Sequence, residues 1–209
     1  PRGISAFIVE KGMKGVRTGK LEKKMGANIS PTCEMIFEEV HVPTKNLVGQ
    51  EGIGFIIAMS ALDSGRITIG ATSVGISRAA LEYSLRYAEE RTQFGQPIAE
   101  FQGIQFMLAD MYTGFEASRL MVLRAAALKD KDRPFTREAS AAKLIATDTA
   151  MQITTNAVQI LGGAGYMKEY PVERFMREAK VMQIVEGTNQ IQRMVIGRFL
   201  KDWSVDSDG

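Results

Sequence analysis

The sequence predicts a mainly α-helical protein in which an antiparallel four-helix bundle follows a partial β domain. Residues 1 to about 50 carry short runs of branched and aromatic side chains separated by glycines, which is typical of strands. From about residue 51 the apolar residues recur at spacings of three and four, which is the period of an amphipathic helix. We therefore expect residues 1–50 to be part of a β domain and residues 51–209 to form the bundle domain.

Two segments of the β region have the composition of strands. Ile4–Glu10 is rich in branched apolar residues, and Cys33–Val42 alternates until Pro43 ends it. A few short strands without a partner sheet cannot bury both of their faces. The chain also begins without a methionine and enters an apolar run at once. We therefore expect it to be a piece of a longer protein.

The helical region divides at its glycines, prolines and polar turns. The first helix carries small residues, such as Gly65 and Gly70, where another helix could approach closely. Because the connections between the helices are short, antiparallel packing in a bundle is the simplest arrangement. The expected helices are residues 55–90, 98–128, 136–161, 171–180 and 189–203.

The last of these helices has a recognisable start. Asn189 and Gln192 have the spacing of a capping box, in which each side chain binds a backbone amide of the first turn. The apolar period of the helix predicts one buried face. That predicted face contains Ile191, Met194, Val195, Phe199 and Trp203.

Composition excludes several kinds of site. The net charge of +2, with no basic block, argues against a nucleic-acid partner. The sequence contains no run of 18 or more apolar residues, which is the length that a membrane-spanning helix requires. Cys33 and His41 are the single residues of their kinds, so we expect neither a disulfide framework nor a metal site. Proton chemistry therefore falls to carboxylates, lysines, tyrosines or a bound cofactor.

The most informative carboxylate is Glu186. It follows the apolar pair Ile184 and Val185 and precedes Gly187, Thr188 and a new helix. A tight turn can hold a carboxylate in place, and apolar neighbours that remove water make it a stronger base. The segment therefore suits a general base, although a surface glutamate in a loop between two helices is the commoner occurrence at this spacing.

Three other groups are compatible with ligand binding. Asp63 and Arg66, at i and i+3, either pair with each other or leave Arg66 for an anionic ligand. Arg91 precedes a turn, where its planar guanidinium suits a diphosphate or serves as a structural anchor. The glycines of residues 162–165 could admit a phosphate, but they match neither the dinucleotide fingerprint nor the P-loop, and a helix stop explains them equally well.

Eight segments, taken in order, carry a family pattern. They are Ile4–Phe7, Phe37–Pro43, Leu62–Arg66, Glu90–Gly95, Phe101–Gln105, Gln159–Gly163, Tyr170–Arg174 and Glu186–Arg193. Together they resemble the C-terminal half of the acyl-CoA dehydrogenases, and the short-chain, butyryl-CoA-like branch most closely. The resemblance spans essentially all 209 residues. It implies an N-terminal helical domain, a middle β domain and a C-terminal four-helix bundle, of which this chain holds the last part.

The resemblance also implies a reaction, in which an acyl-CoA of fatty acid β-oxidation becomes a trans-2-enoyl-CoA. Glu186 matches the catalytic base that removes the α-proton, while the β-hydrogen leaves as hydride to FAD. The residues that match substrate contacts are Asp63, Ser64, Gly65, Arg66 and Gly187. The residues that match FAD contacts, often to an FAD held mainly by a neighbouring subunit, are Arg91, Gln102, Gln159, Ile160, Leu161, Gly162, Gly163, Thr188, Asn189 and Gln190.

Partners and compartment are implied in the same way. They are an acyl-CoA substrate, an electron-transfer flavoprotein as electron acceptor, a homotetramer, and the bacterial cytoplasm or the mitochondrial matrix. In the isovaleryl-type branch the base stands at the position of Gly65, which cannot serve here, whereas Glu186 is present. Residues 28–32 depart from the family's usual loop, so no function is carried onto them.

Two alternatives remain open. One keeps the chemistry and changes the substrate to a branched, cyclic or dicarboxylic acyl-CoA. The other is a relative of the fold that binds DNA or a protein partner, against which the near-neutral charge and the intact Glu186-Gly187-Thr188 segment argue. Because the family's main flavin-binding strands precede this region, we expect the chain alone to hold neither FAD nor substrate well.

Overall fold

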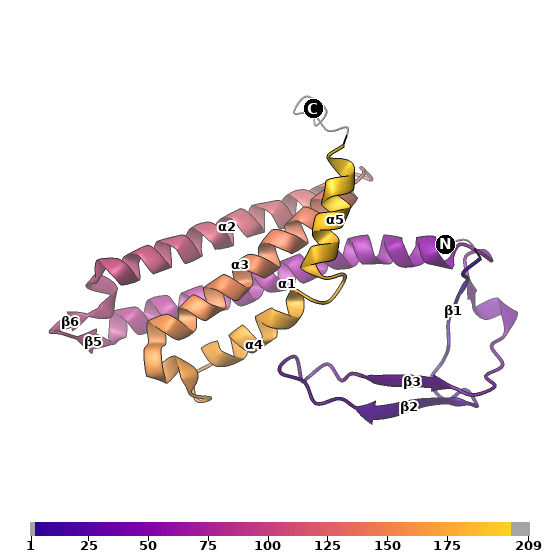
Figure 1. Cartoon of the computed structure of the whole chain (residues 1–209), viewed down its shortest axis with the longest axis horizontal. Coiled ribbons are helices and arrows are strands. Elements are labelled where there is room, and N and C mark those ends of the chain that lie inside the picture. The colour runs from indigo at the N-terminus through magenta and orange to yellow at the C-terminus, as the bar shows by residue number, and fades with distance from the viewer. Residues whose placement is uncertain (1–2, 202–209) are drawn as a thin grey trace. The chain divides into compact units, whose positions relative to one another are not determined.

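The computed structural model describes residues 3–201, which are mainly helical (Figure 1). Contacts divide the chain into two compact units, Pro1–Leu62 and Asp63–Gly209, and helix α1 (Gly54–Glu90) runs from one into the other. Between residues 3 and 201, no helix combines the length and the apolar character that crossing a membrane requires.

The first unit contains two antiparallel strand pairs. Strand β1 (Ala6–Phe7) pairs with β4 (Leu47–Val48), and the short 3-10 helix η1 (Thr44–Asn46) precedes β4. Strand β2 (Val16–Leu21) pairs with β3 (Cys33–Phe37), with a bulge between Thr18 and Leu21. The large apolar side chains of these strands, including Phe7 and Phe37, are about half exposed, as expected for strands without a covering sheet.

The strands are shorter than the sequence predicts, and this part of the prediction was wrong. Of Ile4–Glu10, only Ala6–Phe7 forms a strand, because the backbone of Ile8 exchanges hydrogen bonds with Asn46 instead. The segment Cys33–Val42 stops being a strand after Phe37. Glu39 has a φ of 50°, and this left-handed residue turns the chain away from the ladder.

The helices agree more closely with the sequence. Helix α3 (Thr136–Leu161) has the predicted bounds, α1 starts one residue early, and α4 covers Val172–Met182. Helix α2 (Gln102–Asp130) starts later than predicted, because Phe101 is extended and residues 98–100 form the 3-10 turn η2 (Ile98–Glu100). Between α1 and α2, strands β5 (Thr92–Gln93) and β6 (Gln96–Pro97) form a hairpin whose two turn residues both have positive φ.

Helix α3 is the centre of the second unit and packs against α2, α4 and α5 (Figure 1). Its inner face is a stripe of alanines, several of them fully buried, so neighbouring backbones approach closely. Gly70 likewise allows α1 and α2 to approach closely, since a Cβ at residue 70 would lie 2.9 Å from Cγ2 of Val122 in α2. Around the C-terminal end of α3, larger side chains form the hydrophobic core. They are Leu81, Met111, Ile153, Ile160, Leu161 and Val172.

The last helix, α5 (Asn189–Phe199), differs from the prediction in two ways. Thr188, not Asn189, is its N-cap, and the Thr188 Oγ1 accepts a hydrogen bond from the Ile191 amide at 3.4 Å. The predicted apolar face is also wrong, because Met194 is 55% exposed and the buried side chains are those of Asn189 and Gln192. The reason is that α3 presents polar groups to α5, as described below. Trp203 lies outside the described residues.

Candidate active site

Glu186 lies in the turn between α4 and α5, after η3 (Gly162–Tyr166) and α4 have brought the chain back along α3. Glu186 and Gly187 have φ values of 54° and 88°, so two consecutive left-handed residues reverse the chain. For a residue with a side chain, this conformation costs on the order of 1–2 kcal/mol. It persists only where the surroundings hold it.

The carboxylate of Glu186 lies against the backbone of α1 at Gly65. A Cβ at residue 65 would stand 2.6 Å from Oε2 and 3.0 Å from Cδ of Glu186, well inside contact distance. Among residues 3–201, no side chain donates a hydrogen bond to this carboxylate. Ile184 is 53% exposed and does not supply the apolar shielding that the sequence predicts for it.

Three buried side chains hold the turn from inside the bundle, and we call Lys143, Asn189 and Gln192 the turn clamp. The Lys143 Nζ donates to the Gly187 carbonyl at 3.1 Å and to Asn189 Oδ1 at 2.7 Å. The Gln192 Nε2 donates to the carbonyls of Glu186 at 3.1 Å and Gly187 at 2.8 Å. Both backbone carbonyls of the turn are thus fixed in direction.

Lys143 is unusual because it is a fully buried lysine on a helix face of small residues, which include alanines, Ser140 and Thr147. Burial lowers the pKa of Lys143 to about 8, and the nearby Arg66 guanidinium lowers it too. The carboxylates of Asp148 and Glu186 act in the opposite direction. Lys143 therefore remains mainly an ammonium at neutral pH.

Asn189 connects the clamp to a wider polar network. Its Nδ2 donates to Thr147 Oγ1 at 2.9 Å and to Asp148 Oδ1 at 2.6 Å. Asp148 also accepts from Gln183 Nε2 at 2.7 Å and pairs with Arg193 at 3.0 Å. This network ties the end of α4 and the start of α5 to α3, and it explains why a polar face of α5 is buried.

The predicted pair of Asp63 and Arg66 forms as an ion pair. Arg66 Nη1 lies 2.5 Å from Asp63 Oδ1, and Thr136 Oγ1 donates to Asp63 Oδ2 at 2.6 Å. Arg66 is 5% exposed, and Ser140 is a further partner at 3.4 Å. The Arg66 Nε is buried without a hydrogen-bond partner among the described residues, so one donor of the guanidinium is unsatisfied.

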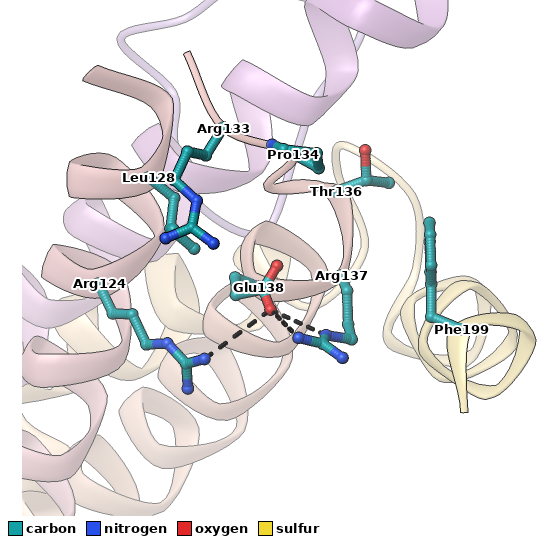
Figure 2. Close-up of a pocket in the computed structure, with 8 residues that line it drawn as sticks. All are labelled: Arg124, Leu128, Arg133, Pro134, Thr136, Arg137, Glu138 and Phe199. Atoms are coloured by element: carbon teal, nitrogen blue, oxygen red, sulfur yellow. Dashed lines mark hydrogen bonds and ion pairs between the residues drawn. The ribbon is translucent and has the colours of Figure 1, made fainter. Parts of the chain in front are cut away.

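A basic pocket adjoins this pair at the turn between α2 and α3 (Figure 2). Its volume is about 360 Å³. Figure 2 shows Glu138 between Arg124 and Arg137, and Arg137 Nη2 lies 2.6 Å from Glu138 Oε1. Thr136 lines the pocket and binds Asp63, which joins the pocket to the ion pair. The lining residues are Arg124, Leu128, Arg133, Pro134, Thr136, Arg137, Glu138 and Phe199.

The residues that resemble FAD contacts fall into two groups. One lies towards the ends of α1 and α3, where Tyr87 Oη of α1 donates to the Leu161 carbonyl at 3.5 Å. The other lies at the start of α5, beside Thr147. About 21 Å of helix separates Thr147 from Leu161. The first group contains Arg91, Gln102, Gln159, Ile160, Leu161, Gly162 and Gly163, and the second contains Thr188, Asn189 and Gln190.

Side-chain burial differs within these groups. Arg91, Gln102, Gln159, Gly162 and Gly163 are exposed, as is Gln190. Ile160 and Leu161 instead belong to the hydrophobic core, so their side chains are not accessible to a ligand. The Asn189 side chain is buried and forms the hydrogen bonds of the turn clamp. Ser64 and Gly65 are half-buried beside Asp63 and Arg66.

Sequence reasoning did not identify Lys143 and Gln192 as site residues. The signal for Lys143 was present, because this lysine stands four residues after Ala139 and three before Ala146, on the alanine-lined side of the helix. The basic pocket was also missed, since its arginines come from separate stretches of α2 and α3 and from the turn between them.

Comparison with known proteins identifies the family to which this chain is similar. The family "Acyl-CoA dehydrogenase, C-terminal domain" matches residues 52–201. A short-chain specific acyl-CoA dehydrogenase from Megasphaera elsdenii is 52% identical over 195 residues, which cover 93% of this chain and 51% of that protein. A cyclohex-1-ene-1-carbonyl-CoA dehydrogenase from Syntrophus aciditrophicus is 52% identical over 200 residues, covering 95% of this chain and 48% of that protein.

A solved structure gives the same result. The butyryl-CoA dehydrogenase of Megasphaera elsdenii superposes with a TM-score of 0.94 at 52% identity, over 95% of this chain and 52% of that one. The chain thus spans about half the length of the relatives it matches. The matched residues include α1 to α5 and the Glu186 turn. On this evidence the chain belongs to the acyl-CoA dehydrogenase family, whose C-terminal domain it contains.

Proposed function

We propose that the full-length protein converts a short-chain acyl-CoA to the trans-2-enoyl-CoA, with Glu186 as the base and FAD as the hydride acceptor. The observation that carries this proposal is the Glu186 turn. Glu186 has a left-handed backbone conformation, and its carboxylate, which has no hydrogen-bond donor among residues 3–201, lies over the α1 backbone at Gly65. Such fixed placement of a base suits the removal of a weakly acidic proton.

Glu186 performs the proton-transfer part of the reaction. One carboxylate oxygen takes the α-proton of the thioester, and the electron pair left at Cα forms the Cα=Cβ double bond as the β-hydrogen departs with its own pair. FAD, when bound, supplies the acceptor for that hydride. The turn clamp and the contact at Gly65 keep the Glu186 carboxylate in one position during the proton transfer.

The residues that resemble FAD contacts fit such a cofactor on two grounds. Arg91 is exposed and suits a diphosphate, and a Cβ at Gly162 or Gly163 would meet nothing within 4 Å, so the backbone there is open. Because the two groups are about 21 Å apart along α3, we assign them to different parts of FAD or to different FAD molecules. In a homotetramer the hairpin end would hold the FAD of a neighbouring subunit, as the family resemblance implies.

The charges near Asp63 favour an anionic substrate. The basic pocket presents Arg124, Arg133 and Arg137 against the single carboxylate of Glu138. Arginine forks bind phosphate oxygens in pairs. We assign this pocket to the phosphates of CoA and the Asp63–Arg66 pair to the adjoining part of the substrate. An electron-transfer flavoprotein is the proposed acceptor of the two electrons.

A second substrate class has specific support. The cyclohex-1-ene-1-carbonyl-CoA dehydrogenase is as similar to this chain as the short-chain enzyme is. The test is anaerobic flavin reduction in the full-length protein with butyryl-CoA, isovaleryl-CoA, glutaryl-CoA and cyclohex-1-ene-1-carbonyl-CoA. We expect butyryl-CoA to give the highest kcat/KM. A preference for the cyclic substrate would establish the alternative, and no reduction by any of them would overturn the dehydrogenase assignment.

A further inference from the structure

We propose that Lys143 is a positioning residue for Glu186, whose buried ammonium holds the Gly187 carbonyl and so keeps the Glu186 carboxylate over Gly65. This inference rests on the proposed function, because it assigns Lys143 to the same reaction. Lys143 is not expected to touch the substrate. It acts through the backbone of the turn and through Asn189.

The first support is the set of hydrogen bonds that the buried Lys143 ammonium donates. The side chain is fully buried, and its two hydrogen bonds go to residues on either side of Thr188, at 3.1 Å to Gly187 and 2.7 Å to Asn189. Burying an ammonium is unfavourable unless its hydrogen bonds are satisfied. Here two of the three N–H donors are used, one by the turn that carries the base and one by the helix that follows it.

The second support is the conformation of the turn. The Gly187 carbonyl accepts from both Lys143 and Gln192, so both of its lone pairs are used. A return of Glu186 from its left-handed conformation to an ordinary one would rotate the adjoining peptides and redirect these carbonyls. That rotation would break the hydrogen bonds to the clamp, so the clamp opposes it.

The third support is charge. Lys143, Arg66, Asp148 and Glu186 interact electrostatically, and Lys143 is mainly protonated at neutral pH because its pKa is about 8. The ammonium therefore lies near the carboxylate of Glu186 without forming a hydrogen bond to it. Removing this charge would therefore change the electrostatic surroundings of Glu186 as well as the hydrogen bonds of the turn.

The test is Lys143→Met in the full-length holoenzyme, with Lys129→Met on the exposed side of α2 as the matched control. Acetyl-CoA is the probe, because it has α-protons but no β-hydrogen to lose as hydride. Exchange of its methyl protons in D₂O, followed by mass spectrometry, reports the base alone. Flavin reduction by butyryl-CoA is measured in parallel, together with FAD content and Tm.

We expect Lys143→Met to lower the exchange rate and kcat by about 10- to 100-fold, because small displacements of a catalytic group have effects of this size. KM should change by less than about threefold and FAD content should stay at the parental level, with Lys129→Met equal to the parent. Parental exchange and kcat in folded Lys143→Met would overturn this proposal. A parent that neither exchanges nor reduces flavin would instead overturn the proposed function.

A second variant covers the case in which Lys143→Met does not fold. Thr147→Val keeps the volume of the side chain and removes the hydroxyl that accepts from Asn189. This loosens the clamp while Lys143 stays in place. We expect a smaller loss of exchange, about 3- to 10-fold, again without a change in KM. Exchange at the parental rate in Thr147→Val would contradict the role of the clamp.

Discussion

Gly65 of α1 and Glu186 of the α4–α5 turn are in contact, and a Cβ at residue 65 would stand 2.6 Å from the Glu186 carboxylate oxygen. The two residues are far apart in the sequence and meet only because the left-handed turn directs Glu186 back towards α1. The absence of a side chain at Gly65 is therefore part of the geometry of the base.

Gly65→Ala is expected to displace the carboxylate. The added methyl group would force Glu186 aside, and flavin reduction by butyryl-CoA should fall by about 10- to 100-fold. Gly75→Ala is the matched control, because the same addition on an exposed turn of α1 meets nothing within 4 Å. It should leave the rate unchanged and stabilise the helix by roughly 0.5–1 kcal/mol. Equal rates in both variants would show that the contact does not constrain the base.

Gly187→Ala should destabilise the turn. Gly187 has a φ of 88°, and a Cβ there would lie 2.8 Å from Gln192 Nε2. Backbone strain and the lost clamp contact together should lower the free energy of unfolding by about 1–3 kcal/mol. Chemical denaturation measures this, and Gly197→Ala in the following helix α5, where a Cβ meets nothing within 4 Å, should not be destabilised. A Gly187→Ala protein as stable as the parent would refute the account of the turn.

The sequence was sufficient to predict features that depend on local signals. Helix α3 has its predicted bounds because a proline-containing turn precedes Thr136 and glycines follow Leu161. The paired Asp63 and Arg66 are one helix turn apart, so their contact is local as well. The role of Glu186 as the base was predicted because its surroundings in the sequence resemble a family motif, and it stays a prediction.

Other features depend on contacts that no local pattern contains. The apolar period of α5 predicted that Met194 would be buried, but the polar face with Gln192 is buried because Lys143 and Thr147 of α3 lie opposite it. Strand β3 ends at Phe37 because of the left-handed Glu39, which the alternating pattern does not indicate. Buried polar networks of this kind are specified by their tertiary partners.

The lowered pKa of Lys143 predicts how stability depends on pH. Its pKa is about 8 in the folded protein against an ordinary value of 10.5, so between these values the unfolded chain binds a proton that the folded protein does not. The stability of the parent should therefore rise with pH across this range, relative to Lys143→Met. The expected difference is on the order of 1–2 kcal/mol after screening by solvent.

Denaturation midpoints of the parent and Lys143→Met at about pH 7, 8, 9 and 10 measure this difference. Subtracting the two curves removes the titration of groups common to both proteins. The charged neighbours Asp148, Arg66 and Glu186 are present in both. A difference that stays flat, or that falls as the pH rises, would contradict a buried lysine with a lowered pKa.

Asp63→Asn should lower the stability of the protein strongly, because it breaks the buried Asp63–Arg66 ion pair. The substitution leaves the Arg66 guanidinium, which is 5% exposed, without its counter-charge. Stability should fall by about 3 kcal/mol, and KM for butyryl-CoA should rise. Glu82→Gln breaks the exposed Arg78–Glu82 pair and should cost less than about 1 kcal/mol. Similar losses in both variants would mean that the Asp63–Arg66 pair behaves as a surface pair.

The most direct test of the central claim is anaerobic flavin reduction by butyryl-CoA in Glu186→Gln of the full-length protein. The amide keeps the size of the side chain and cannot take up the α-proton, so the rate should fall by about 1,000-fold while FAD content and Tm stay at parental values. Glu169→Gln, an exposed glutamate before α4, should reduce flavin at the parental rate. Reduction of Glu186→Gln within twofold of the parent would contradict the assignment of Glu186 as the base.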